Sequence, residues 1–181
     1  MKKLKRIHYA KDKDYLFVDG YNIINSWEKL KNLSSSSLED TRHRLIDILS
    51  EYSNYTGEEI ILVFDGYMVK KSPGVIYLYN GIIIVYTKEH ETADHFIERQ
   101  LHEIGRYRNV RVATSDSIEQ QLILSRGGTR ISARELEMEV ENIKSKIENK
   151  TKKLKEQSKV NINSLDDDIL EKLKEIKNRL D

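Results

Sequence analysis

Two short segments, Tyr15-Leu-Phe-Val-Asp19-Gly20 and Ile60-Ile-Leu-Val-Phe-Asp65-Gly66, share one design and decide the fold. Each is a run of apolar residues that ends in an aspartate followed by a glycine. Near-continuous apolar runs of this length are typical of strands that are covered on both faces, the usual condition of a parallel sheet. A third segment of this kind, Val110-Arg-Val-Ala-Thr114, leads into Ser115 and Asp116. The chain is therefore expected to contain a parallel sheet.

Helical patterns separate these strands. Residues 38–55 and residues 92–105 carry apolar side chains at intervals of three or four, which is typical of an amphipathic helix. The serines at 34–37 predict a surface loop that caps the first of these helices. Because strands and helices alternate along the chain, we expect an α/β sandwich with right-handed crossovers.

One segment departs from this alternation and predicts a β-hairpin. Val75-Ile-Tyr-Leu-Tyr79 and Ile82-Ile-Ile-Val-Tyr86 flank Asn80-Gly81, and Asn-Gly between two apolar runs is the strongest short hairpin signal. The second arm is expected to join the main sheet. The first arm is expected to lie at an edge of the sheet.

The C-terminal part of the sequence predicts helices. After a short apolar segment at Thr129–Ile131, apolar residues recur at intervals of three or four, at Leu136, Val140, Ile143 and Ile147. Residues 161–164 are expected to interrupt the helix, and residues 165–180 to form a last one. The lysine-rich stretch at residues 144–159 is most simply a solvated helix face, and binding of ribosomal RNA is the alternative.

These patterns divide the chain into three parts. Residues 1–14 form a basic N-terminal segment, residues 15–143 a single core domain, and residues 144–181 a charged helical extension. A total of 181 residues suits one core with an appendage, because one core typically takes about 100 to 200 residues.

Composition narrows the possible functions. The absence of cysteine excludes disulfides, thiolate zinc sites and cysteine nucleophiles, and fits a reducing compartment. The basic start is followed by charged residues at 11–14 where a signal peptide needs an apolar stretch, and no apolar run is long enough to span a membrane. The protein is therefore expected to be cytoplasmic. A formal net charge of +1 does not distinguish between partners.

Four aspartates are predicted to meet at one edge of the sheet. Asp19, Asp65 and Asp116 each follow a predicted strand, and Asp94 falls in the first turn of the helix after the hairpin. In an open α/β sheet, residues just beyond the carboxyl ends of the strands line a common crevice. Four carboxylates would then share a small volume at this crevice.

Such a cluster is costly unless protons or cations neutralise it, because like charges repel at short distance. Carboxylate oxygens with water suit Mg²⁺ or Mn²⁺, and such an ion can activate water for attack on a phosphodiester. Each acid taken alone also has a structural explanation. Asp19 and Asp65 can be turn residues, Asp116 can form a capping box with Glu119, and Asp94 suits a helix N-terminus. Their placement at the same predicted edge favours the metal site.

A resemblance to a known family adds to this interpretation. Phe17-Val-Asp-Gly-Tyr-Asn-Ile-Ile24, Val63-Phe-Asp-Gly66, Glu91-Thr-Ala-Asp94 and Thr114-Ser-Asp116 resemble, in this order and spacing, the motifs of the NYN domain family and its YacP-like branch of PIN-type ribonucleases. The similarity extends from about Tyr15 to Ile143.

The resemblance implies a three-layer α/β/α PIN-like fold with a mainly parallel sheet. It also implies a divalent-metal endoribonuclease that acts on messenger RNA, in bacterial members at the ribosome. Asp19, Asp94 and Asp116 match the metal-ligand positions, and Asp65 is a further catalytic acid. Asn22 matches a polar position that could hold a water or a phosphate oxygen, and Ser115 could do the same.

Further residues are candidates for holding single-stranded RNA. Loop cations can bind phosphates, and tyrosines near the acids can stack on unpaired bases. Solvation of the cations and ordinary packing of the tyrosines are equally compatible with the sequence. The candidates are Lys70, Lys71, Arg126 and Arg130 for the phosphates, and Tyr21 and Tyr67 for the bases.

Two other functions compete with the nuclease. A phosphoryl-transfer enzyme with an aspartyl nucleophile commonly has a second acid two residues on, where this chain has Tyr21. A non-catalytic RNA- or ribosome-binding adaptor would keep the fold, but it would not need all four acids. Nucleoside triphosphate hydrolysis lacks support because the chain contains no Gly-x-x-x-x-Gly-Lys-Ser/Thr loop.

Overall fold

The computed structural model describes residues 1–66, 73–104, 109–114 and 128–177, with side chains described up to residue 156. The chain forms two compact units, Met1–Val140 and Glu141–Asp181. In the described part of the chain, no helix is both long and apolar enough to cross a membrane.

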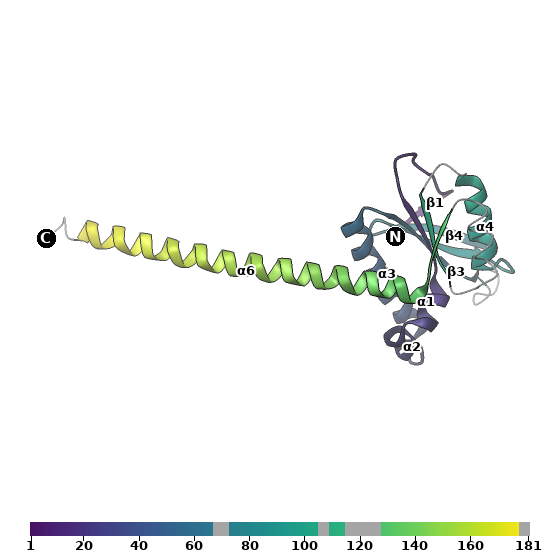
Figure 1. Ribbon diagram of the computed structural model, residues 1–181, viewed down its shortest axis with the longest axis horizontal. Helices are drawn as coiled ribbons and strands as arrows, with labels where there is room; N and C mark the ends of the chain where they lie inside the picture. Colours follow the sequence, from purple (N-terminus) through teal and green to yellow (C-terminus); the bar gives the residue numbers. More distant parts are fainter. Residues whose placement is uncertain (67–72, 105–108, 115–127, 178–181) are drawn as a thin grey trace. The chain divides into compact units, whose positions relative to one another are not determined.

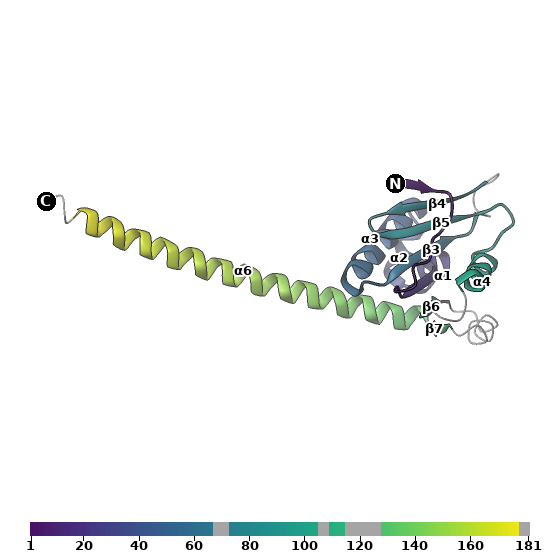
Figure 2. The same cartoon turned by 90° about the horizontal axis from the view of Figure 1, so that it is seen from above.

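The first unit is built on a seven-stranded sheet in the described residues (Figures 1 and 2). In spatial order the strands are β1 (Lys2–Leu4), β4 (Pro73–Tyr79), β5 (Ile82–Lys88), β3 (Glu59–Phe64), β2 (Tyr15–Asp19), β6 (Val110–Ala113) and β7 (Thr129–Ile131). The five strands from β5 to β7 are parallel to one another. β4 is antiparallel to both of its neighbours. The prediction of a mainly parallel sheet is confirmed.

Helices cover both faces of this sheet, as Figures 1 and 2 show. One face packs on α4 (Ala93–Ile104), and alternate residues of the central strands, such as Phe17, Ile61 and Val63, form a buried cluster with it. On the other side lie α1 (Gly20–Ser26), α2 (Glu28–Ser34) and α3 (Leu38–Thr56). β2 and β3 are almost fully buried along their length because they are covered on both faces.

The start of α3 agrees with the predicted cap. The Ser37 side chain accepts a hydrogen bond from the Asp40 backbone N–H at 3.2 Å, and the helix ends at Gly57 in the left-handed conformation, with φ of 77°. The predicted span, residues 38–55, differs from the observed helix by one residue.

The hairpin forms as predicted, but its first arm is not an edge strand. Asn80 and Gly81 have φ of 47° and 85°, which the two-residue turn requires, and β5 pairs in parallel with β3. β4, however, is covered by β1, which pairs Lys3 with Tyr77. The edge prediction for β4 was wrong because a three-residue strand rich in lysine carries no apolar periodicity. Lysines suit an edge strand because they oppose pairing with other chains.

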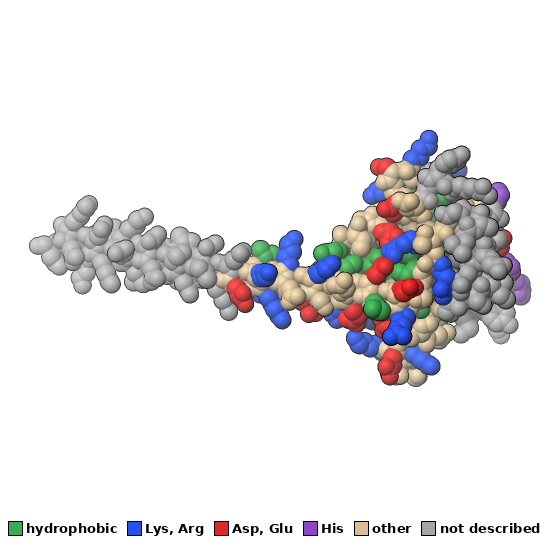
Figure 3. Space-filling model, in the orientation of Figure 1, with side chains coloured by type: hydrophobic (Ala, Val, Ile, Leu, Met, Phe, Trp, Pro, Cys, Tyr) green, Lys and Arg blue, Asp and Glu red, His purple; other side chains and the backbone are tan. Residues whose placement is uncertain are grey.

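The C-terminal helix α6 (Ala133–Lys177) is continuous. The predicted interruption at residues 161–164 was wrong. Neither glycine nor proline occurs in α6, and asparagine or serine in a helix costs only up to about 0.7 kcal/mol per residue relative to alanine. The lysines at 144, 146, 150, 152, 153 and 155 are exposed. Figure 3 shows cations and acids intermixed over the described part of the face drawn.

Candidate active site

Asp19 ends β2 and caps the helix that follows. Its Oδ1 accepts a hydrogen bond from the Asn22 backbone N–H at 3.1 Å, and its extended backbone, with φ of −72° and ψ of 106°, starts α1 at Gly20. This cap fixes the carboxylate at the carboxyl edge of the sheet. The close packing of Gly20 under the Phe64 ring, where a Cβ would overlap the ring, holds the start of the helix against β3.

Asp65 directly follows β3, the strand paired in parallel with β2. Its Oδ1 accepts a hydrogen bond from the Ala93 backbone N–H, at the first residue of α4. The turn after Asp65 is fastened by Thr87, whose Oγ1 accepts from the Gly66 backbone N–H at 2.7 Å and donates to the Glu91 carbonyl oxygen at 2.5 Å. One network therefore joins the end of β3, the end of β5 and the start of α4.

Asp94 lies in the first turn of α4, as predicted, and close enough to the other two acids for their charges to interact. Burial raises the pKa of Asp19 from 3.8 to about 6. The Asn22 hydrogen bond opposes this shift in the pKa, and the charges of Asp94 and Asp65 add to it. Burial also raises the pKa of Asp65, against the effect of the Ala93 hydrogen bond and with a contribution from Asp94.

Three carboxylates from three elements therefore share one electrostatic environment at the predicted edge. The donor set fits a hard divalent cation, because it consists of carboxylate oxygens, and the charges of Asp94 and Asp65 both raise the pKa of Asp19. Within the described ranges, no three acidic, histidine or cysteine side chains converge closely enough to form a metal cluster by themselves. The fourth predicted acid, Asp116, lies outside the described residues, as do Ser115, Lys70, Lys71, Tyr67 and Arg126.

The two polar candidates next to Asp19 are half-buried on α1. Asn22 gives its backbone N–H to Asp19, and its Oδ1 lies 3.5 Å from the Ser26 hydroxyl, which donates to it. The Tyr21 ring packs edge-on against Phe64, with 5.3 Å between ring centroids. Arg42 donates from Nε to the Tyr21 hydroxyl at 3.1 Å, and its guanidinium lies 5.8 Å from the centre of the ring.

Of the four cations predicted to bind phosphates, Arg130 is the one that falls within the described residues. It lies on β7, where it pairs with Val112 of β6. Its side chain is half-buried, and its buried Nε has no hydrogen-bond partner among the described residues. Thr114, at the end of β6, is buried, and its backbone N–H donates to the Ile131 carbonyl oxygen at 3.3 Å.

Sequence reasoning assigned no role to three residues that shape this site. Thr87 and Glu91 hold the turn that carries Asp65, and Arg42 orients Tyr21. A threonine at the end of a strand is common, so Thr87 has no distinguishing signal in the sequence. Arg42 reaches Tyr21 from a neighbouring helix, and one sequence cannot reveal that contact.

The fold and the gathered acids define the class of this protein. It is an α/β/α protein with a mainly parallel sheet and an acidic site beyond the carboxyl ends of its strands.

Comparison with known proteins identifies the family. The model of the YacP-like NYN domain matches residues 16–178. The chain is 39% identical over 158 residues to the uncharacterised protein YacP of Bacillus subtilis (strain 168), covering 87% of this chain and 92% of that protein. The chain therefore belongs to the YacP-like NYN domain family, as the sequence motifs indicated.

Solved structures agree with this assignment. The crystal structure of Rae1 (YacP) from Bacillus subtilis matches with a TM-score of 0.68 and 36% identity, over 91% of this chain and 95% of that one. The crystal structure of a tryptophan-to-leucine mutant of Rae1 matches with a TM-score of 0.69 and 40% identity, over 78% and 83% of the two chains. The family suggests a PIN-like nuclease related to RNA, which agrees in class with the acidic site.

Proposed function

We propose that this protein is a divalent-metal-dependent endoribonuclease that hydrolyses phosphodiester bonds of single-stranded RNA. The observation that carries the proposal is the electrostatic coupling of Asp19, Asp65 and Asp94 at one sheet edge, where burial raises the pKa of Asp19 to about 6. Placing three acids within range of one another's charges, with Asp19 and Asp65 partly buried, is unfavourable. A cation that also binds phosphate would remove this penalty and serve the reaction.

Each acid has a role in this proposal. Asp19 and Asp94, together with Asp116, would hold Mg²⁺ or Mn²⁺, and Asp65 is a further acid beside them. When bound, the ion supplies activation of water and stabilisation of charge on the phosphate. Asn22 and Ser115 would contact a water or a phosphate oxygen.

The remaining candidates would hold the RNA strand. Lys70, Lys71, Arg126 and Arg130 would bind its phosphates, because phosphate contacts supply most of the affinity for nucleic acid. Tyr21, held by Phe64 and Arg42, would stack on an unpaired base.

The substrate would be messenger RNA, cleaved in the cytoplasm and on the translating ribosome. Support comes from membership of the YacP-like NYN family, which is related to RNA nucleases. Translating ribosomes therefore belong in the test beside naked RNA.

The proposal is tested by incubating the purified protein with single-stranded RNA and Mn²⁺ or Mg²⁺, with and without EDTA. Wild type is compared with Asp19→Asn and Asp94→Asn, and with Asp47→Asn as a control, because Asp47 is exposed in the middle of α3. We expect metal-dependent cleavage that both site variants lose and the control keeps.

The alternative outcomes are distinct. RNA binding without cleavage of either naked or ribosome-bound RNA would identify a non-catalytic adaptor and refute the nuclease. Equal cleavage by wild type and by both site variants would mean that the acids are not the catalytic groups.

A further inference from the structure

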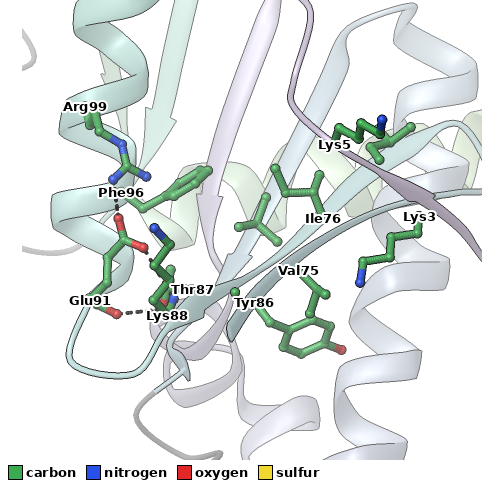
Figure 4. Close-up of a pocket in the computed structure, with 13 residues that line it drawn as sticks. Lys3, Lys5, Val75, Ile76, Tyr86, Thr87, Lys88, Glu91, Phe96 and Arg99 are labelled. Atoms are coloured by element: carbon green, nitrogen blue, oxygen red, sulfur yellow. Dashed lines mark hydrogen bonds and ion pairs between the residues drawn. The ribbon is translucent and has the colours of Figure 1, made fainter. Parts of the chain in front are cut away.

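A groove of about 600 Å³ lies beside the acidic edge, where β1, β4, β5 and α4 meet (Figure 4). Sites that hold small organic groups commonly have volumes of roughly 300 to 1,000 Å³. Ile76 of β4 contributes apolar surface, whereas Phe96 of α4 is largely buried and has the Arg99 guanidinium 5.2 Å from its ring centre. Lys5, Lys88 and Arg99 lie around the groove, so it combines an apolar floor with a cationic rim.

Most of the positive charge on this rim is uncompensated. Arg99 is paired with Glu91 at 2.6 Å. Lys5 and Lys88 are exposed, and their ammonium groups form no ion pair with any residue that the structure describes. Glu91 accepts from the backbone N–H of Lys88, at 3.3 Å, and so leaves the side chain of Lys88 available.

The groove is physically continuous with the turn that carries Asp65. Thr87 and Glu91 both line the groove, and Thr87 Oγ1 accepts the hydrogen bond from the Gly66 backbone N–H. The pairing of Pro73 with Lys88 places the open end of the hairpin at the same edge of the sheet as the end of β3. Lys88 therefore lies at the same edge of the sheet as Asp65, which directly follows β3.

We propose that this groove is a subsite for single-stranded RNA next to the scissile bond, with phosphates against Lys5 and Lys88 and the less polar part of a nucleotide over Ile76. The inference rests on the proposed function. RNA is favoured as the occupant because lysines beside an apolar surface match a phosphate chain with unpaired bases, and because the groove adjoins a site suited to phosphodiesters.

The test measures the dissociation constant for a fluorescent single-stranded RNA of about 12 nucleotides, a length that a single-strand binding groove can cover. Measurements in EDTA prevent cleavage, and affinity is recorded at several salt concentrations. The pocket variant is Lys5→Ala/Lys88→Ala. Its control, Lys11→Ala/Lys13→Ala, removes the same charge just before β2, at the opposite edge of the sheet.

We expect the pocket variant to bind RNA about tenfold more weakly at about 0.1 M salt. The slope of the logarithm of the binding constant against the logarithm of the salt concentration should become about 1.4 shallower, because each of two lost phosphate contacts to a single strand contributes about 0.7. The control should change affinity less than about twofold and keep the wild-type slope. Lys5→Arg/Lys88→Arg should restore binding, which would assign the effect to charge and not to packing. Circular dichroism confirms that all variants are folded.

Several results would overturn the subsite. These are equal weakening by pocket variant and control, no weakening by the pocket variant, or no RNA binding by wild type. If nucleoside monophosphates compete strongly with RNA, and if RNA affinity does not depend on Lys5 and Lys88, the groove would be assigned to a free nucleotide. RNA binding that depends on Lys5 and Lys88, without cleavage under any condition, would support the RNA-binding groove and refute the nuclease. Cleavage by the wild type together with unchanged RNA binding by the pocket variant would support the nuclease and refute the subsite.

Discussion

Replacing Asp19 by asparagine should stabilise the metal-free protein at neutral pH. Burial and two neighbouring acids raise the pKa of this carboxyl from 3.8 to about 6. At about 1.4 kcal/mol per pKa unit, ionisation of Asp19 in the folded state costs up to about 3 kcal/mol. Asparagine keeps an oxygen that can accept the Asn22 hydrogen bond, and it carries no charge.

The pH dependence follows from the direction of this shift. Because the folded state binds the proton more tightly than the unfolded state, the stability that Asp19 contributes is complete below about pH 4 and is lost as pH rises through about 6. As the pH rises from about 4 to about 6, the wild type should therefore become less stable than the Asp19→Asn variant. At pH 7.5 we expect the variant to be about 1 to 3 kcal/mol more stable, a gain of roughly 2 to 4 °C in melting temperature for each kcal/mol.

The measurement is thermal unfolding of both proteins in EDTA from pH 4 to pH 8, with Asp47→Asn as the surface control. A gain that is present at pH 7.5 and vanishes near pH 4 supports the reasoning. A variant that is no more stable at pH 7.5, or one that is equally stabilised at pH 4, would refute the electrostatic origin.

Three other predictions follow from the same structure. Mn²⁺ or Mg²⁺ at about 100 times its dissociation constant should stabilise wild type by about 2.7 kcal/mol in thermal unfolding. It should leave the Asp19→Asn variant nearly unchanged, and equal stabilisation of both would place the cation elsewhere. A Cβ at Gly66 would overlap the Thr87 carbonyl oxygen, so Gly66→Ala should destabilise the folded protein by about 1 to 3 kcal/mol and reduce cleavage. Unfolding and cleavage equal to those of the wild type would contradict this prediction. Arg111→Met leaves Glu58 buried without its 2.7 Å ion pair and should lower the free energy of unfolding in urea by about 2 to 4 kcal/mol. The double variant Arg111→Met/Glu58→Leu should recover part of this loss. A single variant as stable as the wild type would show that the ion pair is dispensable.

The parts of the fold that sequence predicted are those fixed by local signals. The apolar runs of β2 and β3 and the Asn80-Gly81 turn carry their information within a few residues, so their positions were confirmed almost to the residue. Asp94 could be placed on the first turn of α4 because amphipathic spacing marks that helix. The acids Asp19 and Asp65 then followed from the rule that parallel strands end at one edge.

The parts that sequence did not predict depend on contacts between distant segments. β1 exists because β4 offers it a partner, and its lysines alone indicate a disordered start as readily as a strand. α1 and α2 are seven residues each, too short for an apolar period to stand out. The Thr87 link to Gly66 joins residues that are 21 apart, and only the assembled sheet brings them together.

The hydrogen bonds of Asp19 and Asp65 explain how these carboxylates can be held in place and still be able to bind a cation. In Asp19 and in Asp65, Oδ1 accepts a backbone N–H from Asn22 and from Ala93. An ionised carboxylate has two oxygens with about four acceptor positions, so these bonds orient the group and leave acceptor capacity for a cation. Alanine would remove both the orientation and the charge, whereas asparagine can keep the accepting oxygen and removes the charge alone. For this reason a loss of cleavage in the asparagine variants, combined with a gain in metal-free stability for Asp19→Asn, would assign the function to the negative charge and not to the fold that positions it.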